Sequence, residues 1–260
     1  MENKEASQVV GSPSAPYTTR LARRYGLAER SYAIRHPSLP NYLALTSGST
    51  HGISSDCTDC SVGTRSIVDQ LDAAGLSWRA YMQGLPRTCY TGASAGGYVK
   101  RHDPFMYYED VARHASRCRH VVPFTRLTRD LRHHALPAYS FVVPDVCNDT
   151  HDCGVSTGDR FLARTVPRLL HRLGPHGFLV LTYDEGDSDA GCCGQASGGR
   201  IATIVAGPGV RRGARMQAPV DHYGVLRTVE DALGLPHLGA AADAAHGSLR
   251  SLFKRPPRIR

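Results

Sequence analysis

Apolar, β-branched runs that alternate with helical patterns are the strongest constraint on the fold of this 260-residue chain. Residues 139–144, 178–185 and 200–210 are predicted to be buried strands, and residues 77–83 a weaker one. Helices are predicted over residues 64–75, 158–174 and 221–234, with Asp159 and Asp221 as N-caps and a kink at Pro167. Such alternation is typical of a largely parallel sheet covered on both faces. We therefore predict an α/β fold in a single domain, residues 1–260.

The charge of the chain is strongly positive, with a formal net charge of +8. Three of the 31 basic residues are lysines, so arginine supplies the other 28. A basic surface attracts anions over long range, and arginine suits phosphate oxygens. No dense basic block stands outside the tail at 254–260, so we do not predict a nucleic-acid partner. No run of 18 apolar residues exists that could form a transmembrane helix.

The eight cysteines favour disulfides and an oxidising compartment. A zinc site built on Cys57 and Cys60 is the alternative, but no second pair stands at zinc-ribbon spacing. Because no secretory leader is visible in "MENKEASQVVGSPSAP", the prediction of a secreted or extracytoplasmic protein implies that the natural start lies upstream.

Acidic residues follow two of the predicted strands. Asp184 and Glu185 end the run "FLVLTYDE", and two adjacent carboxylates repel each other unless a cation lies between them. The second strand leads into "DVCNDTHDC", which places Asp149 and His151 in a loop that Cys147 and Cys153 could close. Oxygen and imidazole ligands at strand ends indicate a divalent metal site, although a solvated acidic turn is the simpler alternative for each motif.

Ser38 stands between two prolines in "HPSLPNYLALTSG", directly before a helical pattern. A serine attacks only when a base or a metal lies beside it. At a helix N-terminus, free N–H groups and the helix dipole would favour a phosphate group, and Asn41 would lie one turn further on. A simple Ser-Pro turn before the helix is the alternative that this stretch leaves open.

The same segment resembles the nucleophile motif of the alkaline phosphatase superfamily. More closely, the chain resembles the bacterial phosphoesterase family of acid phosphatases and phospholipases C. The resemblance includes "MENK", "YVKRHDPF", "PDVCNDTHDC", "LVLTYDEG" with "RIATIVAGPGV", and "DHYGVLRTVEDALGLPHLG", in collinear order over nearly the whole chain. It implies a three-layer α/β/α sandwich in which the strand that precedes "MENK" in the family is cut off at Met1.

The resemblance also implies roles for individual residues. Ser38 would be the nucleophile that forms a phosphoseryl intermediate, and Asn41 would contact the phosphoryl oxygens. Asn3 and His102 would border the substrate. One or two divalent metal ions would be held by the remaining motif residues: Glu2, Asp149, His151, Asp184, Glu185 and His222.

We therefore expect a metal-dependent phosphoesterase, most consistent with a phosphomonoesterase of the acid-phosphatase type. The substrate would be a phosphate ester, with a phospholipid head group as one candidate. A phospholipase C or another phosphodiesterase is the alternative on the same scaffold. An inactive, basic anion-binding protein is the alternative of another class.

Overall fold

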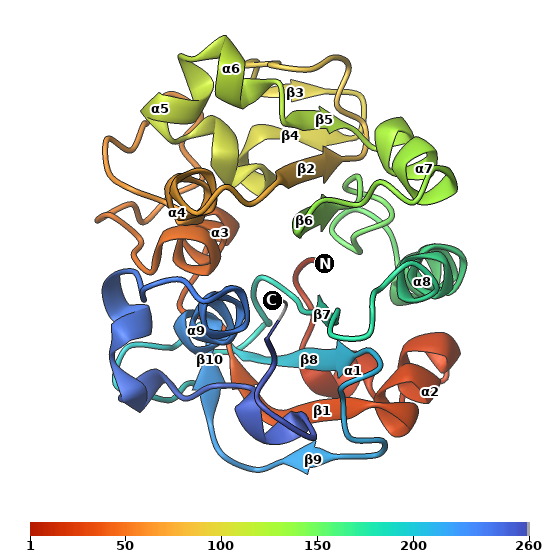
Figure 1. Ribbon diagram of the computed structural model, residues 1–260. Coiled ribbons are helices and arrows are strands. Elements are labelled where there is room, and N and C mark those ends of the chain that lie inside the picture. Colours follow the sequence, from red (N-terminus) through yellow and green to blue (C-terminus); the bar gives the residue numbers. More distant parts are fainter. Residues whose placement is uncertain (259–260) are drawn as a thin grey trace.

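The computed structural model describes residues 1–258, which form two main sheets with helices on both sides (Figure 1). The larger sheet has the strand order β10-β1-β8-β7, and β9 also pairs with β1. Its strands are β1 (Gly26–Tyr32), β7 (Leu179–Leu181), β8 (Arg200–Ala206), β9 (Arg215–Met216) and β10 (Val220–Asp221). Strand β8 is antiparallel to both β1 and β7, whereas β9 and β10 are parallel to β1.

The smaller sheet is wholly parallel, with β2 (Trp78–Met82) between β5 (Val121–Pro123) and β6 (Tyr139–Val143). A short hairpin joins β3 (Ser94–Ala95) to β4 (Tyr98–Val99). The predicted α/β class is therefore confirmed, but only part of the sheet structure is parallel.

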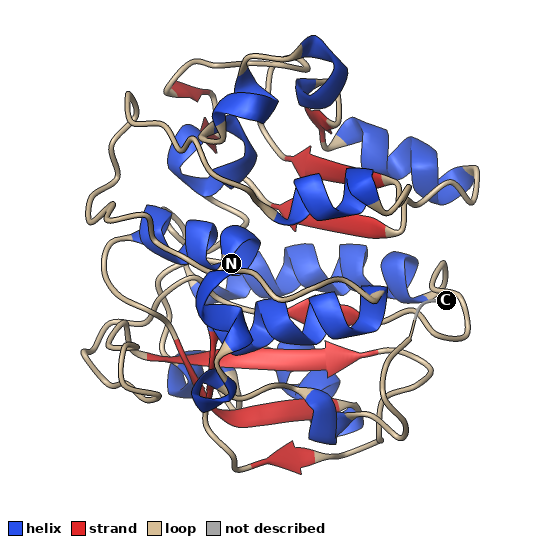
Figure 2. Cartoon of the chain, turned by 60° about the vertical axis from the view of Figure 1, so that its left-hand side comes forward, coloured by secondary structure: helices blue, strands red, loops and turns tan. Residues whose placement is uncertain are grey.

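The helices lie in two layers that enclose the sheets (Figures 1 and 2). One layer holds α3 (Ser38–Ser47), α4 (Ile67–Ala73) and α9 (His222–Leu233), whose apolar side chains share a core with β2. The other holds α2 (Pro16–Arg24), α7 (Thr125–Arg132) and α8 (Val155–Leu170), which pack on the opposite side. The shorter helices are α1 (Ala6–Val9), α5 (Glu109–Ala112), α6 (Ala115–Cys118) and the 3₁₀ turns η1 (Lys100–His102), η2 (Pro104–Met106), η3 (Gly239–Ala242), η4 (Ala244–His246) and η5 (Arg250–Leu252).

Residues 1–4 run between the two sheets, where Figure 1 places the N-terminus. The Glu2 N–H donates to the carbonyl of Asp149, beyond β6, at 2.8 Å. On the other side, the Asp184 N–H, beyond β7, donates to the carbonyl of Met1 at 2.9 Å. These main-chain bonds join the carboxyl ends of β6 and β7 through the N-terminal segment.

Most predicted elements are confirmed, but the cap of α8 differs, and elements such as α2, α7, β5 and β1 were not predicted. Asp221 caps α9 as expected, but Asp159 lies inside α8, which begins after Gly154 and continues past Pro167. The Asp159 carboxylate instead accepts the N–H groups of Tyr17 and Thr18 at 2.9 and 2.7 Å, which caps α2 from a neighbouring helix. Strand β1 was not predicted because its sequence, GLAERSY, contains two charged residues and no apolar run.

All eight cysteines form disulfides: Cys57–Cys60, Cys89–Cys118, Cys147–Cys153 and Cys192–Cys193. The preference for disulfides over a zinc site is therefore confirmed. In particular, the Cys147–Cys153 bond closes the acidic loop after β6, as its spacing suggested. Among the described helices, none has the length and apolarity needed to cross a membrane.

Candidate active site

Ser38 is the first residue of α3 and is buried at 2% exposure. Its hydroxyl oxygen lies within hydrogen-bond distance of two carboxylates, Glu185 Oε1 at 3.2 Å and Glu2 Oε2 at 3.3 Å, and can donate its proton to either. A buried alcohol between two carboxylates has proton acceptors within reach, so the serine meets the first requirement of a nucleophile. The Ser-Pro turn alone does not account for this placement.

The Asn41 side chain holds the segment that leads into Ser38. Its Oδ1 accepts the N–H groups of Ile34 and Arg35 at 2.9 and 3.2 Å. Its Nδ2 donates to the carbonyls of Arg35 and Pro37 at 2.6 and 3.2 Å. Both amide protons are therefore committed to the main chain, and the expected donation from Asn41 to a phosphoryl oxygen is not supported by this arrangement.

Glu2 lies at the centre of the buried polar residues around Ser38. The Tyr42 hydroxyl, one turn along α3, donates to Glu2 Oε1 through a short hydrogen bond. His102 Nε2 lies 3.3 Å from Glu2 Oε2, and its Nδ1 lies 3.2 Å from Asp149 Oδ2. The Asn3 N–H donates to Asp184 Oδ1 at 3.1 Å. The structure thus brings together most of the residues that the motifs identified.

The electrostatics of this group are unfavourable without a cation. Burial, together with the charges of Asp184 and Asp149, raises the pKa of Glu2 well above its ordinary value. Burial and Asp184 raise the pKa of Glu185 to about 7. Buried carboxylates that resist ionisation together are stabilised when a positive charge is placed among them.

His222 opens α9 and is fully buried. Its Nε2 donates to the carbonyl oxygen of Asp184 at 2.6 Å, and burial lowers its pKa to about 4. The ring is therefore neutral at physiological pH. Its Nδ1 keeps a lone pair that has no hydrogen-bond partner, which suits a metal ligand or a structural role.

His151 does not join this group. Its Nδ1 lies 2.6 Å from Asp152 Oδ1, and its Nε2 lies 3.2 Å from an Arg101 guanidinium nitrogen. Its ring centre is 5.7 Å from that of His102. Both ring nitrogens thus have other partners, and the expectation that His151 completes a metal position does not match this geometry.

Besides Tyr42, two further residues that were not predicted border the site: His36 and Asp56. His36 contacts Glu185 through Nδ1 and lies 3.2 Å from the Ser188 carbonyl through Nε2. Although burial lowers the pKa of His36, these two acceptors outweigh that effect and raise it. Asp56 accepts the Leu39 N–H at 2.9 Å and lies 3.5 Å from Arg101 Nε.

The sequence contains only weak signals for these additional residues. His36 and Tyr42 stand within the Ser38 motif, but spacing alone does not show which face of a helix turns toward a carboxylate on another segment. The contact between Tyr42 and Glu2 joins residues 40 positions apart and depends on the tertiary fold. Asp56 belongs to a loop that has no apolar periodicity to place it.

A divalent cation fits the donor set around Glu2. Three buried polar atoms in this region make neither a hydrogen bond nor an ion pair in the described part of the chain: Asn3 Oδ1, Asp184 Oδ2 and His222 Nδ1. Buried polar atoms rarely lack a partner, and a bound ion is one common explanation. Ligand atoms of Glu2, His102 and Asp149 also lie within 4.8 Å of one another, close enough to share an ion.

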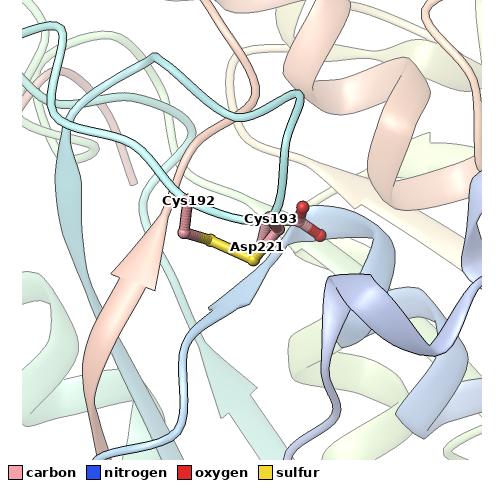
Figure 3. A group of neighbouring side chains, drawn as sticks. All are labelled: Cys192, Cys193 and Asp221. Atoms are coloured by element: carbon pink, nitrogen blue, oxygen red, sulfur yellow. A yellow bond between two sulfur atoms is a disulfide. The ribbon is translucent and has the colours of Figure 1, made fainter.

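A second group of potential ligands is Cys192, Cys193 and Asp221 (Figure 3). The two sulfur atoms are bonded to each other, so no thiolate is present to bind a metal. The Asp221 oxygens also have partners, because Oδ1 caps α9 and Oδ2 lies 2.5 Å from His246 Nδ1. With the disulfide formed, this group therefore has a structural role and offers no free metal ligand.

Comparison with known proteins agrees with the fold and the motifs. A model of the Phosphoesterase family matches residues 4–236, so the chain belongs to this family. It is 32% identical over 245 residues to a phosphatidylinositol-3-phosphatase of Mycobacterium tuberculosis, covering 94% of this chain and 78% of the relative. It is 29% identical over 232 residues to a phosphate-repressible acid phosphatase of Penicillium chrysogenum, covering 85% of this chain. The chain spans about half the length of that fungal relative, 55%.

Solved structures support the same fold at low identity. A protein of the alkaline phosphatase superfamily from Vibrio parahaemolyticus superposes with a TM-score of 0.64 at 12% identity, covering 94% of this chain and 68% of that chain. Murine ectonucleotide pyrophosphatase/phosphodiesterase 5 gives 0.61 at 11% identity, covering 97% and 98%. The predicted phosphoesterase family is thus confirmed, as is an enzyme class that hydrolyses phosphoric esters, and the solved structures confirm the fold.

Proposed function

We propose that this protein is a metal-dependent phosphomonoesterase that uses Ser38 as its nucleophile. The observation that carries the proposal is the position of the Ser38 hydroxyl, 3.2 and 3.3 Å from carboxylates of Glu185 and Glu2. The names of the acid phosphatase and phosphatidylinositol-3-phosphatase relatives support a monoester as the substrate class. The 32% identity to the second of these makes a phosphorylated lipid head group one candidate substrate.

In the proposed reaction, Ser38 Oγ forms a bond to phosphorus while the bond from phosphorus to the leaving oxygen breaks. The Ser38 hydroxyl lies 3.2 and 3.3 Å from carboxylate oxygens of Glu185 and Glu2, which can relay its proton, and the proton ends on the leaving oxygen. Water then hydrolyses the phosphoseryl group and restores the hydroxyl. Asn41 acts through the main chain by fixing the segment that holds Ser38.

Glu2, Asp184 and Glu185 would hold a divalent cation beside Ser38, with Asn3 at its border. Asp149, His102 and His222 would serve the same ion or a second one. Such an ion lowers the pKa of an adjacent hydroxyl and neutralises charge on the phosphoryl oxygens. His102, between Glu2 and Asp149, would also face the substrate. The proposal treats residues 1–260 as a single catalytic domain.

An extracytoplasmic location is part of the proposal, because four disulfides persist best in an oxidising compartment. Cytosolic thiol pools would reduce such bonds. The location is tested by comparing the protein's activity after expression in the cytoplasm with its activity after export, with free thiols counted in both samples. If the protein from the cytoplasm had full activity with all eight thiols free, the disulfides would no longer support an extracytoplasmic location.

The enzymatic proposal is tested with Ser38→Ala and a matched Ser116→Ala, which changes an exposed serine in α6. Hydrolysis of a chromogenic phosphomonoester and of the corresponding diester is followed with and without a chelator. We expect Ser38→Ala to lose at least about a thousandfold in kcat with an unchanged circular dichroism spectrum, and Ser116→Ala to match the wild type. Wild-type turnover by Ser38→Ala would overturn the nucleophile assignment, and faster diester cleavage would favour a phosphodiesterase.

A further inference from the structure

The layer of α2, α7 and α8 carries a single sign of charge on its outer side. These helices are neighbours: Leu21 of α2 shares a core with Phe161 and Leu162 of α8, and Leu127 of α7 shares another with Leu169 of α8. Figure 1 shows the three helices along one edge of the molecule. The exposed arginines on them are Arg20, Arg23, Arg24, Arg126, Arg129, Arg132, Arg160, Arg164 and Arg168. We call this set the arginine face.

No exposed acidic residue balances these charges within the three helices. Their only carboxylates, Asp130 and Asp159, are buried at 2% and 5% exposure. Asp130 is paired with Arg79 and with Arg126, while Asp159 caps α2. Apart from Arg126, the members of the arginine face form no salt bridge in the described part of the chain. Uncompensated arginines on one side create a strong positive field.

We propose that the arginine face docks this protein on the surface of an anionic lipid bilayer. Each arginine near an anionic membrane contributes about 1 kcal/mol of attraction, and several neighbouring arginines act together. The described residues expose no large hydrophobic side chain, so attachment is electrostatic and without insertion. A layer of three packed helices spreads its charge over a broad surface, which suits a bilayer.

A nucleic acid is the competing polyanion, and the surface favours lipid over it. Single strands are bound through exposed aromatic rings that stack on bases, and the arginine face exposes none. Duplex binding by helices usually inserts one of them into the major groove, whereas α8 lies between α2 and α7 in the layer.

The N-terminal end of α8, which carries part of the arginine face, lies close in sequence to the candidate active site. Helix α8 begins at Val155, two residues after Cys153, which closes the loop that carries Asp149. The inference concerns binding, so it stands apart from the proposed catalytic function and is tested with protein that lacks the nucleophile.

The test measures binding of the Ser38→Ala protein to sedimented vesicles of phosphatidylcholine, alone or with about 30% phosphatidylserine. A face variant carries Arg23→Gln, Arg129→Gln and Arg164→Gln, one change in each helix. A matched control carries Arg87→Gln, Arg119→Gln and Arg250→Gln, exposed arginines of other segments with the same total charge change. The three proteins are compared at low and high salt.

We expect binding to the anionic vesicles alone, lost at high salt because of screening. The face variant should bind at least about tenfold more weakly than the control variant. Equal losses of vesicle binding in both variants would show a general effect of net charge. They would overturn the proposal that the arginine face is the docking surface. So would the absence of binding to anionic vesicles, or tighter binding to duplex or single-stranded DNA at equal phosphate concentration. Thermal unfolding of all three proteins shows whether a loss comes from misfolding.

Discussion

Ser38 Oγ and Glu185 Oε1 lie 3.2 Å apart, although 147 positions separate the two residues in the sequence. Ser38 is brought to this point by the start of α3 and Glu185 by the exit of β7. The contact also depends on residues 1–4, which join the ends of β6 and β7 and place Glu2 on the other side of the serine. The chemistry of this hydroxyl is therefore governed by three segments distant in sequence.

Tyr42→Phe is expected to weaken catalysis more than stability. The variant removes the hydroxyl that donates to Glu2 Oε1, so Glu2 gains rotational freedom and loses a charge-stabilising bond. We expect kcat/KM to fall by about ten- to a hundredfold and the affinity for metal to fall with it. Steady-state kinetics and metal titration measure these effects. Tyr139→Phe is the control, because the Tyr139 hydroxyl makes no hydrogen bond to another described residue. Equal losses in both variants would contradict the prediction.

Removal of metal is expected to destabilise the protein, most strongly at alkaline pH. Glu2 and Glu185 have raised pKa values, so without a cation the folded state binds protons more tightly than the unfolded chain. Stability of the metal-free protein therefore falls as pH rises from about 4.5 through about 7. We expect a chelator to lower Tm by at least about 5 °C near pH 8 and by much less near pH 5.

Asp184→Asn provides the comparison for this experiment. The substitution removes one negative charge from the group and one oxygen ligand, so the variant should bind metal weakly and show a smaller shift in Tm on chelation. The same chelator shift in the variant and the wild type would place the bound metal elsewhere. Calorimetric or dye-based melting curves at both pH values measure the difference.

Helices and strands could be predicted from the sequence where they have an apolar pattern and a capping residue. Candidate site residues could be predicted where they stand together in a short contiguous motif. The α9 boundaries follow from Asp221 and Gly234, and Ser38 could be located because its prolines and the helical run are contiguous. Asp159 was misjudged because a carboxylate that caps a neighbouring helix has the same sequence pattern as one that caps its own. The ligand role of His151 stays a prediction, because proximity in sequence to Asp149 does not fix the direction of a side chain on a tight loop.

Asn41→Ala is expected to lower the stability of the fold, and any loss of catalysis is expected to follow from that change. Four main-chain groups of residues 34, 35 and 37 lose their side-chain partner. Buried groups left without a partner cost about 1–3 kcal/mol each where water cannot reach them, so we expect a loss of at least about 2 kcal/mol. Urea denaturation measures this value. If Asn41→Ala kept wild-type stability and lost only affinity for inorganic phosphate, direct contact with the substrate would be the better explanation.

The disulfides are expected to differ widely in their contribution to stability. The Cys89–Cys118 bond closes a loop with a sequence separation of 29, whereas Cys192 and Cys193 are adjacent. Loop-closure entropy predicts that Cys89→Ser with Cys118→Ser costs about 3 kcal/mol, and that Cys192→Ser with Cys193→Ser costs about 1 kcal/mol or less. Equilibrium unfolding of the two double variants measures the difference. A larger loss from the adjacent pair would indicate that it supports the loop between β7 and β8 through native-state contacts.

Glu230 gives the protein a source of pH-dependent stability outside the candidate site. The side chain is fully buried in α9; Oε1 accepts the Leu238 N–H at 2.9 Å, and Oε2 has no partner. Burial raises its pKa to about 8, from an ordinary value of 4.5. The folded state therefore holds this proton when the unfolded state has released it, and stability declines as pH rises from about 4.5 through about 8.

Glu230→Gln removes the ionisation and keeps an acceptor for Leu238, so we expect a gain of about 2 kcal/mol over the wild type near pH 9 and a smaller gain near pH 5. Urea denaturation at both pH values measures this, with Asp59→Asn, an exposed carboxylate, as the control. A Glu230→Gln protein with the same pH dependence of stability as the wild type would show that this carboxyl titrates in its ordinary range.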